Sequence, residues 1–209
     1  MIKLSKLIII FSLFSGLTTQ AQTKLIDSLS YFVGKKIEIE SLTSRDNWLN
    51  CFFKGKYEVV EVLKGDFKTG DTVEVIIFDH EDCPPIFTEF PHAFIGFRLQ
   101  DNGENWILRG ENCTQVFKST DDNWVTGAFG YPKRIKHLEE PYPIQLAEAF
   151  YYNIKQLSRF NLNALKHPDD SDAIYSERNY SIDFVNDKVK LLRGYTVIDR
   201  YKILIRNFE

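Results

Sequence analysis

Between residues 31 and 109 the chain repeats one pattern, in which a short strand-like run is followed by residues that favour turns. In the first run, residues 31–40, apolar Val33, Ile37 and Ile39 alternate with charged residues, the period of two that gives a strand one buried and one wet face. Similar runs cover residues 56–63, 72–78, 92–99 and 105–109. Five short strands with turn signals between them predict a small antiparallel barrel or sandwich.

The turn between the second and third runs is the clearest of these signals. Residues 64–71 (KGDFKTGD) hold two glycines, which supply positive φ, and two aspartates, which form local side-chain hydrogen bonds. Since β-branched and aromatic residues flank this turn on both sides, we predict a hairpin here.

The pattern changes after the barrel region, where longer apolar stripes appear. From Ile144 to Leu157 apolar residues recur mostly at three- and four-residue steps, which predicts a helix. A second helix is expected after Ser181, which could cap it, with apolar positions between Phe184 and Leu192. Residues 196–208 are ambiguous between helix and strand. We therefore expect a helical C-terminal segment at residues 140–209.

The first 21 residues predict export from the cytoplasm. Lys3 and Lys6 precede an apolar run from Leu7 to Leu17, and small residues at Thr19 and Ala21 form a cleavage site. The run is shorter than the about 20 apolar residues that a membrane span needs. We expect a signal peptide cut near Ala21 and a secreted or periplasmic mature protein without a membrane span. The composition, rich in Lys, Ile and Asn, is typical of bacterial proteins.

The charge balance excludes one large class of partners. The chain has 26 Lys and Arg residues against 29 Asp and Glu residues, a net charge of −3. A nucleic-acid-binding protein normally carries a strongly basic patch, so we expect no nucleic-acid partner. The cysteines are Cys51, Cys83 and Cys113. In an oxidising compartment two of them are expected to pair, and the spacing leaves all three pairings open.

Several short motifs resemble those of netrin-like domains, the OB-type barrels that include the tissue inhibitors of metalloproteinases. Residues 59–65 (VVEVLKG) resemble the V-x-E-V-x-K-G strand and turn of that family, and residues 32–36 (FVGKK) resemble its first-strand motif F-x-G-K-V. Cys83 before residues 94–97 (FIGF) resembles a C-G…Y-L-V-F block, and residues 108–114 resemble the later strand that leads into a cysteine. The resemblance covers about residues 31–116 and implies a five-stranded OB-type antiparallel barrel at residues 31–125, in a mainly β protein with some α.

The chain departs from this family at its N-terminus. The inhibitors begin with Cys-x-Cys, whose amine and carbonyl groups chelate the protease zinc, whereas residues 22–24 here are Gln-Thr-Lys. Zinc-chelating protease inhibition is therefore not expected. The N-terminal cysteines that would pair with Cys83 and Cys113 are also absent. By the resemblance, we hypothesise that Cys83 and Cys113 pair with each other and that Cys51 is a buried thiol.

Two groups of residues are candidates for a functional site. His80, Asp82, Cys83 and His92 carry donors that zinc prefers, although the cluster lacks a second ligand pair at matching spacing and also reads as a polar turn. The second group consists of aromatic residues that could stack on sugars or on a partner's side chains, although aromatic residues are also the usual core formers. Its members are Trp48, Trp106, Trp124, Tyr131 and Tyr142.

The sequence contains no Gly-rich phosphate loop, no G-x-S-x-G elbow and no H-E-x-x-H motif. OB-type barrels commonly bind oligomers on one face. We therefore expect a non-catalytic binding module that engages an extracytoplasmic protein or glycan and needs no cofactor. The alternative is a metal-binding protein or metalloenzyme that uses His80, Cys83 and His92.

Overall fold

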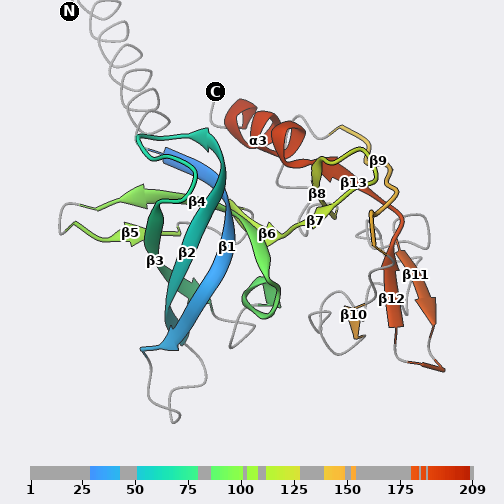
Figure 1. Ribbon diagram of the computed structural model, residues 1–209, viewed down its shortest axis with the longest axis horizontal. Coiled ribbons are helices and arrows are strands. Elements are labelled where there is room, and N and C mark those ends of the chain that lie inside the picture. Colours follow the sequence, from blue (N-terminus) through green and yellow to red (C-terminus); the bar gives the residue numbers. More distant parts are fainter. Residues whose placement is uncertain are drawn as a thin grey trace, which may run out of the picture.

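The computed structural model describes the chain in ten stretches that together cover the barrel and most of the C-terminal elements. They are residues 29–42, 51–79, 86–100, 103–107, 112–127, 139–148, 152–153, 180–183, 185–186 and 188–207. Most of these residues are in β-strands, and one α-helix lies near the C-terminus (Figure 1). The expected class, mainly β with some α, is confirmed.

The N-terminal half forms a closed five-stranded barrel (Figure 1). Its strands are β1 (Leu29–Ser41), β2 (Cys51–Lys64), β3 (Thr72–Asp79), β4 (His92–Leu99) and β5 (Asn105–Trp106). They are hydrogen-bonded in the order β1-β2-β3-β5-β4, and β4 pairs with β1 to close the ring. This is the OB-type barrel that the sequence predicted.

One pair of neighbours in the ring departs from the antiparallel expectation. β3 and β5 run parallel, with Ile76 opposite Trp106, while the other four pairs are antiparallel. Parallel neighbours need a long crossover connection. Here that connection includes the 3-10 turn η1 (Ile86–Glu89) and β4. After β4 the chain returns to β3 and places β5 on the side of β3 that faces away from β2.

The predicted hairpin between β2 and β3 is present. Gly65 and Gly70 adopt φ of 130° and 93°, a region that favours glycine, and the Lys68 N–H donates to Asp71 Oδ2 over 2.7 Å. β2 begins at Cys51, five residues before the predicted run, and stays paired with β3 from Cys51 opposite Asp79 onward.

The barrel interior is a core of aromatic and β-branched side chains. Alternate residues of β2 point inward, among them Phe53, Tyr57 and Val59, and they pack with Phe32 of β1 and Phe97 of β4. Burying one such side chain is worth about 1.5–3 kcal/mol relative to leaving it exposed. The interior is therefore packed with side chains, which places any binding surface on the outside of the wall.

The chain after the barrel forms short strands and one helix. β6 (Cys113–Gln115) continues the barrel sheet beside β4, and two further sheets have the orders β7-β8-β13-β9 and β10-β12-β11. Their strands are β7 (Phe117–Lys118), β8 (Trp124–Thr126), β9 (Tyr142–Pro143), β10 (Tyr152–Asn153), β11 (Tyr180–Asp183), β12 (Lys188–Leu191) and β13 (Arg193–Thr196). The helix α3 (Val197–Arg206) starts at Thr196, whose hydroxyl accepts from the Asp199 N–H over 3.1 Å. This cap resolves the ambiguous C-terminal stretch as a helix.

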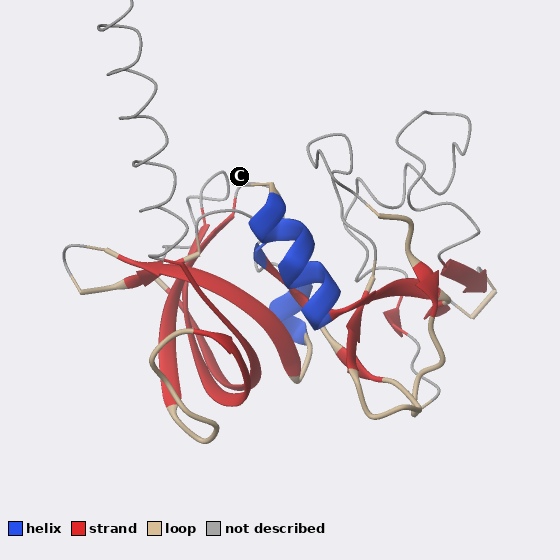
Figure 2. Ribbon diagram, turned by 90° about the horizontal axis from the view of Figure 1, so that it is seen from above, coloured by secondary structure: helices blue, strands red, loops and turns tan. Residues whose placement is uncertain are grey.

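A second core joins the barrel to these C-terminal elements. Because neighbouring residues of a strand point to opposite faces, Tyr31 and Val33 of β1 lie on the outside of the barrel while Phe32 lies inside it. There they pack with Phe94 of β4 and with residues of β8, β13 and α3. Figure 2 shows α3 between the barrel and the C-terminal strands.

The other helix predictions for the C-terminal segment differ from the structure. The stretch expected to hold a helix after Ser181 contains β12 instead, where Val189 and Leu191 are buried while Lys188 and Lys190 are exposed. That period of two outweighs the looser apolar spacing on which the prediction rested. The described part of the predicted helix at 144–157, residues 144–148 and 152–153, holds no helix and includes β10.

The predicted signal peptide, residues 1–21, lies outside the described residues. None of the helices in the described ranges is long and apolar enough to cross a membrane.

Candidate functional site

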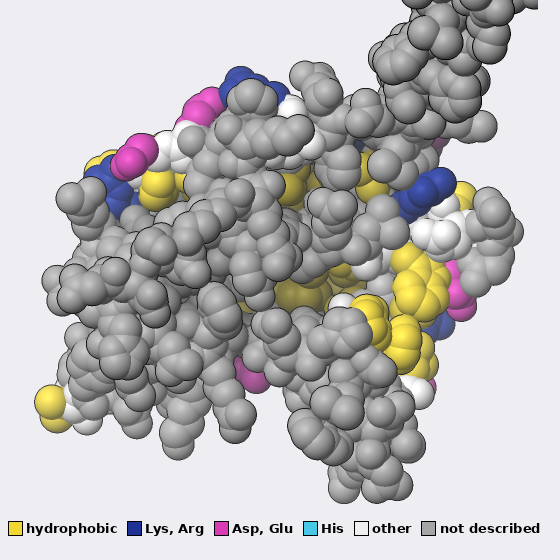
Figure 3. Space-filling model, turned by 180° about the vertical axis from the view of Figure 1, so that it is seen from behind, with side chains coloured by type: hydrophobic (Ala, Val, Ile, Leu, Met, Phe, Trp, Pro, Cys, Tyr) yellow, Lys and Arg dark blue, Asp and Glu magenta, His cyan; other side chains and the backbone are white. Residues whose placement is uncertain are grey.

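The outer surface of the barrel has two different sides. The outer face of β1 and β4 is covered by the second core, through Tyr31, Val33 and Phe94. The wall formed by β2, β3 and β5 instead carries large exposed apolar side chains, with Phe78 36% exposed and nearby Leu42 50% exposed. Seen from behind, hydrophobic side chains gather on the outside of the barrel, with acidic and basic side chains beside them (Figure 3).

Strand register places five apolar side chains on one face, which we call the aromatic patch, and of these Phe78 and Leu42 are exposed. Residues directly opposite in antiparallel strands share a face, as do residues two apart in one strand. Phe52 stands opposite Phe78, and Ile76, two residues before Phe78, stands opposite Trp106. Leu42 extends the row, since its N–H donates to the Phe52 carbonyl over 2.8 Å.

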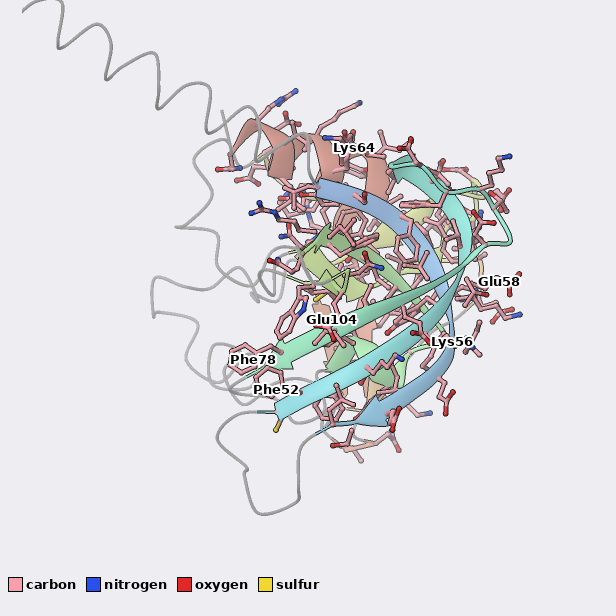
Figure 4. The ribbon with its side chains drawn as sticks, turned by 90° about the vertical axis from the view of Figure 1, so that its left-hand side faces the viewer. Phe52, Lys56, Glu58, Lys64, Phe78 and Glu104 are labelled. Atoms are coloured by element: carbon pink, nitrogen blue, oxygen red, sulfur yellow. The ribbon has the colours of Figure 1, made fainter. Side chains whose placement is uncertain are left out.

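The rings of the aromatic patch form a corner rather than a flat platform. The Phe52 and Phe78 ring centroids lie 4.8 Å apart with planes tilted by 33°, whereas Trp106 stands nearly edge-on to Phe52 at 6.1 Å and 77°. Figure 4 shows Phe52 and Phe78 side by side at the neighbouring ends of β2 and β3. Ring pairs of this kind add about 0.5–1.5 kcal/mol beyond area burial, so the corner is partly held by its own contacts.

Hydrogen bonds fix β5, and with it the Trp106 ring, against β3. The indole Nε1–H of Trp106 donates to Glu104 Oε2 over 3.0 Å, and Asn105 Nδ2 donates to the Glu74 carbonyl over 2.8 Å. The Ile107 N–H donates to the Ile76 carbonyl over 3.0 Å. Since the polar edge of the indole is engaged, its apolar faces are the part left for stacking.

Charges of both signs surround the aromatic patch. Lys54 Nζ lies 2.8 Å from Glu74 Oε2, and this hydrogen-bonded pair raises the pKa of Lys54 and lowers the pKa of Glu74. Across the same face, residues of opposite charge alternate between strands. Glu40 stands opposite Lys54, Glu38 and Glu74 stand opposite Lys56, and Arg98 stands opposite Trp106. The face therefore has little net charge.

The predicted metal cluster is only partly within the described residues. His92 is there, with its ring 4.8 Å from the Trp124 ring, while Lys118 Nζ lies 4.7 Å from the same ring. Burial, with smaller contributions from Lys35 and Lys118, lowers the pKa of His92. Among the described residues no three His, Cys, Asp or Glu side chains are grouped to hold a metal ion. His80, Asp82 and Cys83 lie outside these residues, so the metal site stays a prediction.

The cysteines differ from the hypothesis drawn from the family resemblance. Cys113 is a buried thiol rather than half of a bridge to Cys83, and Cys51, expected to be the thiol, is disulfide-bonded. Cys113 stands opposite Ile95 among the apolar residues of the barrel core, where a thiol packs as a small hydrophobic group. Cys51 is the first residue of β2 and stands opposite Asp79. Asp79 precedes Cys83 by four positions in the sequence, and Cys83 itself lies outside the described residues.

The five predicted stacking residues fall into different environments. Trp106 is half-exposed on the aromatic patch, but Trp124 is buried in the second core, which corrects its assignment as a candidate. Tyr142 is 36% exposed, yet its hydroxyl donates to Asp199 Oδ2 over 2.9 Å and so ties β9 to the start of α3. Trp48 and Tyr131 lie outside the described residues.

The sequence analysis missed Phe52 and Phe78. A signal was available, because an inward Phe53 in strand β2 requires an outward Phe52. The predicted strand started at residue 56, however, and the partner Phe78 is set by register, which sequence alone does not give.

Comparison of the chain with protein-family models, with characterised proteins and with solved structures gave no match. The likeness to netrin-like domains therefore stays a prediction from short motifs. The OB-type strand order, in contrast, is a property of the structure itself.

Proposed function

We propose that this protein is a non-catalytic binding module that works outside the cytoplasm, secreted or periplasmic, and that the aromatic patch is its ligand surface. The observation that supports this most is the ring corner on the outer wall of β2, β3 and β5, where exposed Phe78 meets the half-buried rings of Phe52 and Trp106. OB-type barrels use the face of their second and third strands to bind oligomers.

The energetics of the aromatic patch support a role in binding. A contiguous exposed apolar patch rimmed by polar residues marks an interaction site, whereas single exposed apolar residues are common on any protein surface. Neither core cluster includes Phe52, Phe78 or Trp106. These three large side chains therefore contribute little to the packing of the barrel interior. The apolar surface that these side chains still expose in the folded protein would be removed from water by a bound ligand, and this would contribute favourable free energy to binding.

The polar groups around the aromatic patch favour binding over reaction. Lys54 and Glu74 neutralise each other, Glu104 accepts from the Trp106 indole, and Asn105 holds the Glu74 carbonyl. Each group thereby orients a neighbour, and the hydrogen-bonded pair raises the pKa of Lys54 and lowers the pKa of Glu74, which favours the charged form of both groups. Such a face recognises a ligand without transferring protons to it.

The proposed place of action is supported by residues 1–21, whose basic start, short apolar run and small-residue cleavage site are typical of a signal peptide. The ligand is then a protein or a glycan of the envelope or of the surroundings.

The test compares the wild-type chain with a Phe52→Ala/Phe78→Ala variant. Each is immobilised and exposed to envelope and culture-medium fractions of the source organism, and retained protein and carbohydrate are quantified. We expect the wild type to retain a component that the variant loses, and we expect the control Ile198→Ala, at an exposed position of α3, to behave as wild type. Equal retention by all three would exclude the aromatic patch as the ligand surface.

A further inference from the structure

We infer that the ligand of the aromatic patch is a neutral, hydroxyl-rich glycan whose sugar rings stack on Phe52, Phe78 and Trp106. This inference rests on the proposed function and names the ligand class for the same surface. It follows from the charge, the shape and the extent of the face.

The charge of the face argues for an uncharged ligand. Carboxylates alternate with cations around the rings, with Glu40 opposite Lys54 and Lys56 opposite Glu74, and Lys54 is paired with Glu74 over 2.8 Å. A polyanion such as nucleic acid or an acidic polysaccharide is held by a basic surface and repelled by carboxylates in this arrangement. The mixture instead offers hydrogen-bond donors and acceptors close together, which suits hydroxyl groups, since each hydroxyl is both.

The shape of the face argues for rings with apolar sides. Phe52 and Trp106 meet at 77°, so one ligand ring can lie on the phenyl face while the next meets the indole. The indole N–H of Trp106 donates to the Glu104 carboxylate. This carboxylate therefore lies beside the stacking surface, where its oxygens can accept hydrogen bonds from ligand hydroxyls. A pyranose ring has an apolar C–H face with hydroxyls at its margin, and this distribution matches an apolar corner with a polar rim.

The extent of the face argues against a folded protein partner. A stable protein interface takes about 20–30 residues from each side, whereas the aromatic patch has five side chains, one of which, Ile76, is already buried. β2 and β3 are also paired on both sides, β2 with β1 and β3, and β3 with β2 and β5. A peptide strand therefore cannot add to β2 by β-augmentation, and β5 occupies the outer edge of β3 at Ile76.

Titration of the exported chain with defined sugars tests the inference. The neutral probes are cellohexaose, chitohexaose, maltohexaose, laminarihexaose and xylohexaose, and a hyaluronan hexasaccharide is the anionic probe, all followed by isothermal titration calorimetry. We expect at least one neutral hexasaccharide to bind, and binding to change little with salt. Phe78→Ala should weaken it by about tenfold, which corresponds to about 1.4 kcal/mol. Ile198→Ala, which changes another exposed apolar residue that lies on α3, is the matched control and should bind as wild type.

Phe78 is exposed, so its replacement leaves the barrel core intact, and thermal unfolding of each variant verifies this. Absence of binding by every neutral probe, binding of the anionic probe alone, or binding that survives both Phe78→Ala and Phe52→Ala would overturn the glycan inference. If the fractionated extracts still yield a component whose retention needs Phe52 and Phe78, and protease removes it, the proposed function stands with a protein ligand. If neither experiment depends on these residues, both proposals fail.

Discussion

Three buried tyrosines hold hydroxyl groups in places where a negative charge is costly. Tyr31 and Tyr57 are fully buried, and their hydroxyl oxygens have no hydrogen-bond partner among the described residues. Burial raises the pKa of both hydroxyls well above the usual value. Burial also raises the pKa of Tyr195 to about 12, and its hydroxyl donates to the Glu139 carbonyl. All three side chains therefore stay neutral in the folded protein at pH values where the unfolded chain ionises.

The protein should lose stability in strongly alkaline solution, above about pH 10, because of these residues. A group whose folded pKa is raised stabilises fully below its unfolded pKa, about 10, and this contribution is lost as pH rises through the folded value. For Tyr195 the window runs from about pH 10 to about pH 12. Urea unfolding midpoints measured across this window should fall more steeply in the wild type than in Tyr195→Phe. Parallel slopes would show that Tyr195 does not contribute.

His92 should make stability depend on pH on the acidic side. Burial, then Lys35 and Lys118, lowers its pKa in the folded state, so the unfolded chain takes up the proton first as pH falls. The free energy of unfolding should therefore decrease as pH drops below about 6.5, the usual histidine value. His92→Gln, which cannot be protonated in this range, should show a shallower decrease in urea midpoints. An NMR titration giving His92 a pKa at or above that of a free imidazole would contradict this expectation.

At the scale of single elements, the sequence predicted the strands that have both a period of two and turn residues at their ends. The β2–β3 hairpin, with Gly65 and Gly70 at positive φ, is the best example. β12 differs from the predicted helix because Val189 and Leu191 alternate with lysines in a period of two, and their apparent helical spacing arises only together with more distant apolar residues. In the structure α3 occupies the stretch that periodicity alone left ambiguous between helix and strand, and Thr196 caps its start.

The candidate site could be predicted only in part for a related reason. Trp106 was singled out from its residue type, but its partners Phe52 and Phe78 are brought to it by pairing between β2, β3 and β5. Register between strands depends on the turn geometry and on which face the core takes, and a shift of one residue would turn every side chain to the other face. The grouping of residues into a surface is thus a tertiary property.

Gly194 shows how closely two C-terminal strands approach each other. A Cβ atom at this position would lie 1.9 Å from the Thr126 carbonyl oxygen, which belongs to the neighbouring strand β8. Backbone cannot move aside as a flexible side chain can. Gly194→Ala should therefore separate β13 from β8 and lower the free energy of unfolding by about 1–3 kcal/mol, the usual cost of overpacking.

The control for Gly194→Ala is Thr120→Ala, at an exposed turn position, which should change stability by less than about 0.5 kcal/mol. Both are measured by urea unfolding. An alanine at 194 with wild-type stability would mean that the two strands lie farther apart than the structure shows.

At the scale of the whole molecule, the second core determines whether barrel and C-terminal elements are one folding unit. Leu29, Tyr31, Val33 and Phe94 come from the barrel, and they share this core with Trp124 and with residues of β13 and α3. Separating the parts would expose a set of large apolar side chains on the outside of β1 and β4. Each would cost about 1.5–3 kcal/mol in water, so we expect the two parts to unfold together.

Two tryptophans in different parts of the molecule make this cooperativity measurable. Trp106 reports on the barrel wall and Trp124 reports on the second core, so their signals, resolved in one chain by 19F NMR of 5-fluorotryptophan, should give coincident urea transitions. Ile203→Ala, at a buried position of α3, should shift both transitions by about 2–5 kcal/mol. Ile198→Ala, on the exposed side of the same helix, should shift neither by more than about 0.5 kcal/mol. If Ile203→Ala moved the Trp124 transition and left the Trp106 transition in place, the barrel would be an independent unit, because its wall would then stay folded without the helix that covers β1 and β4.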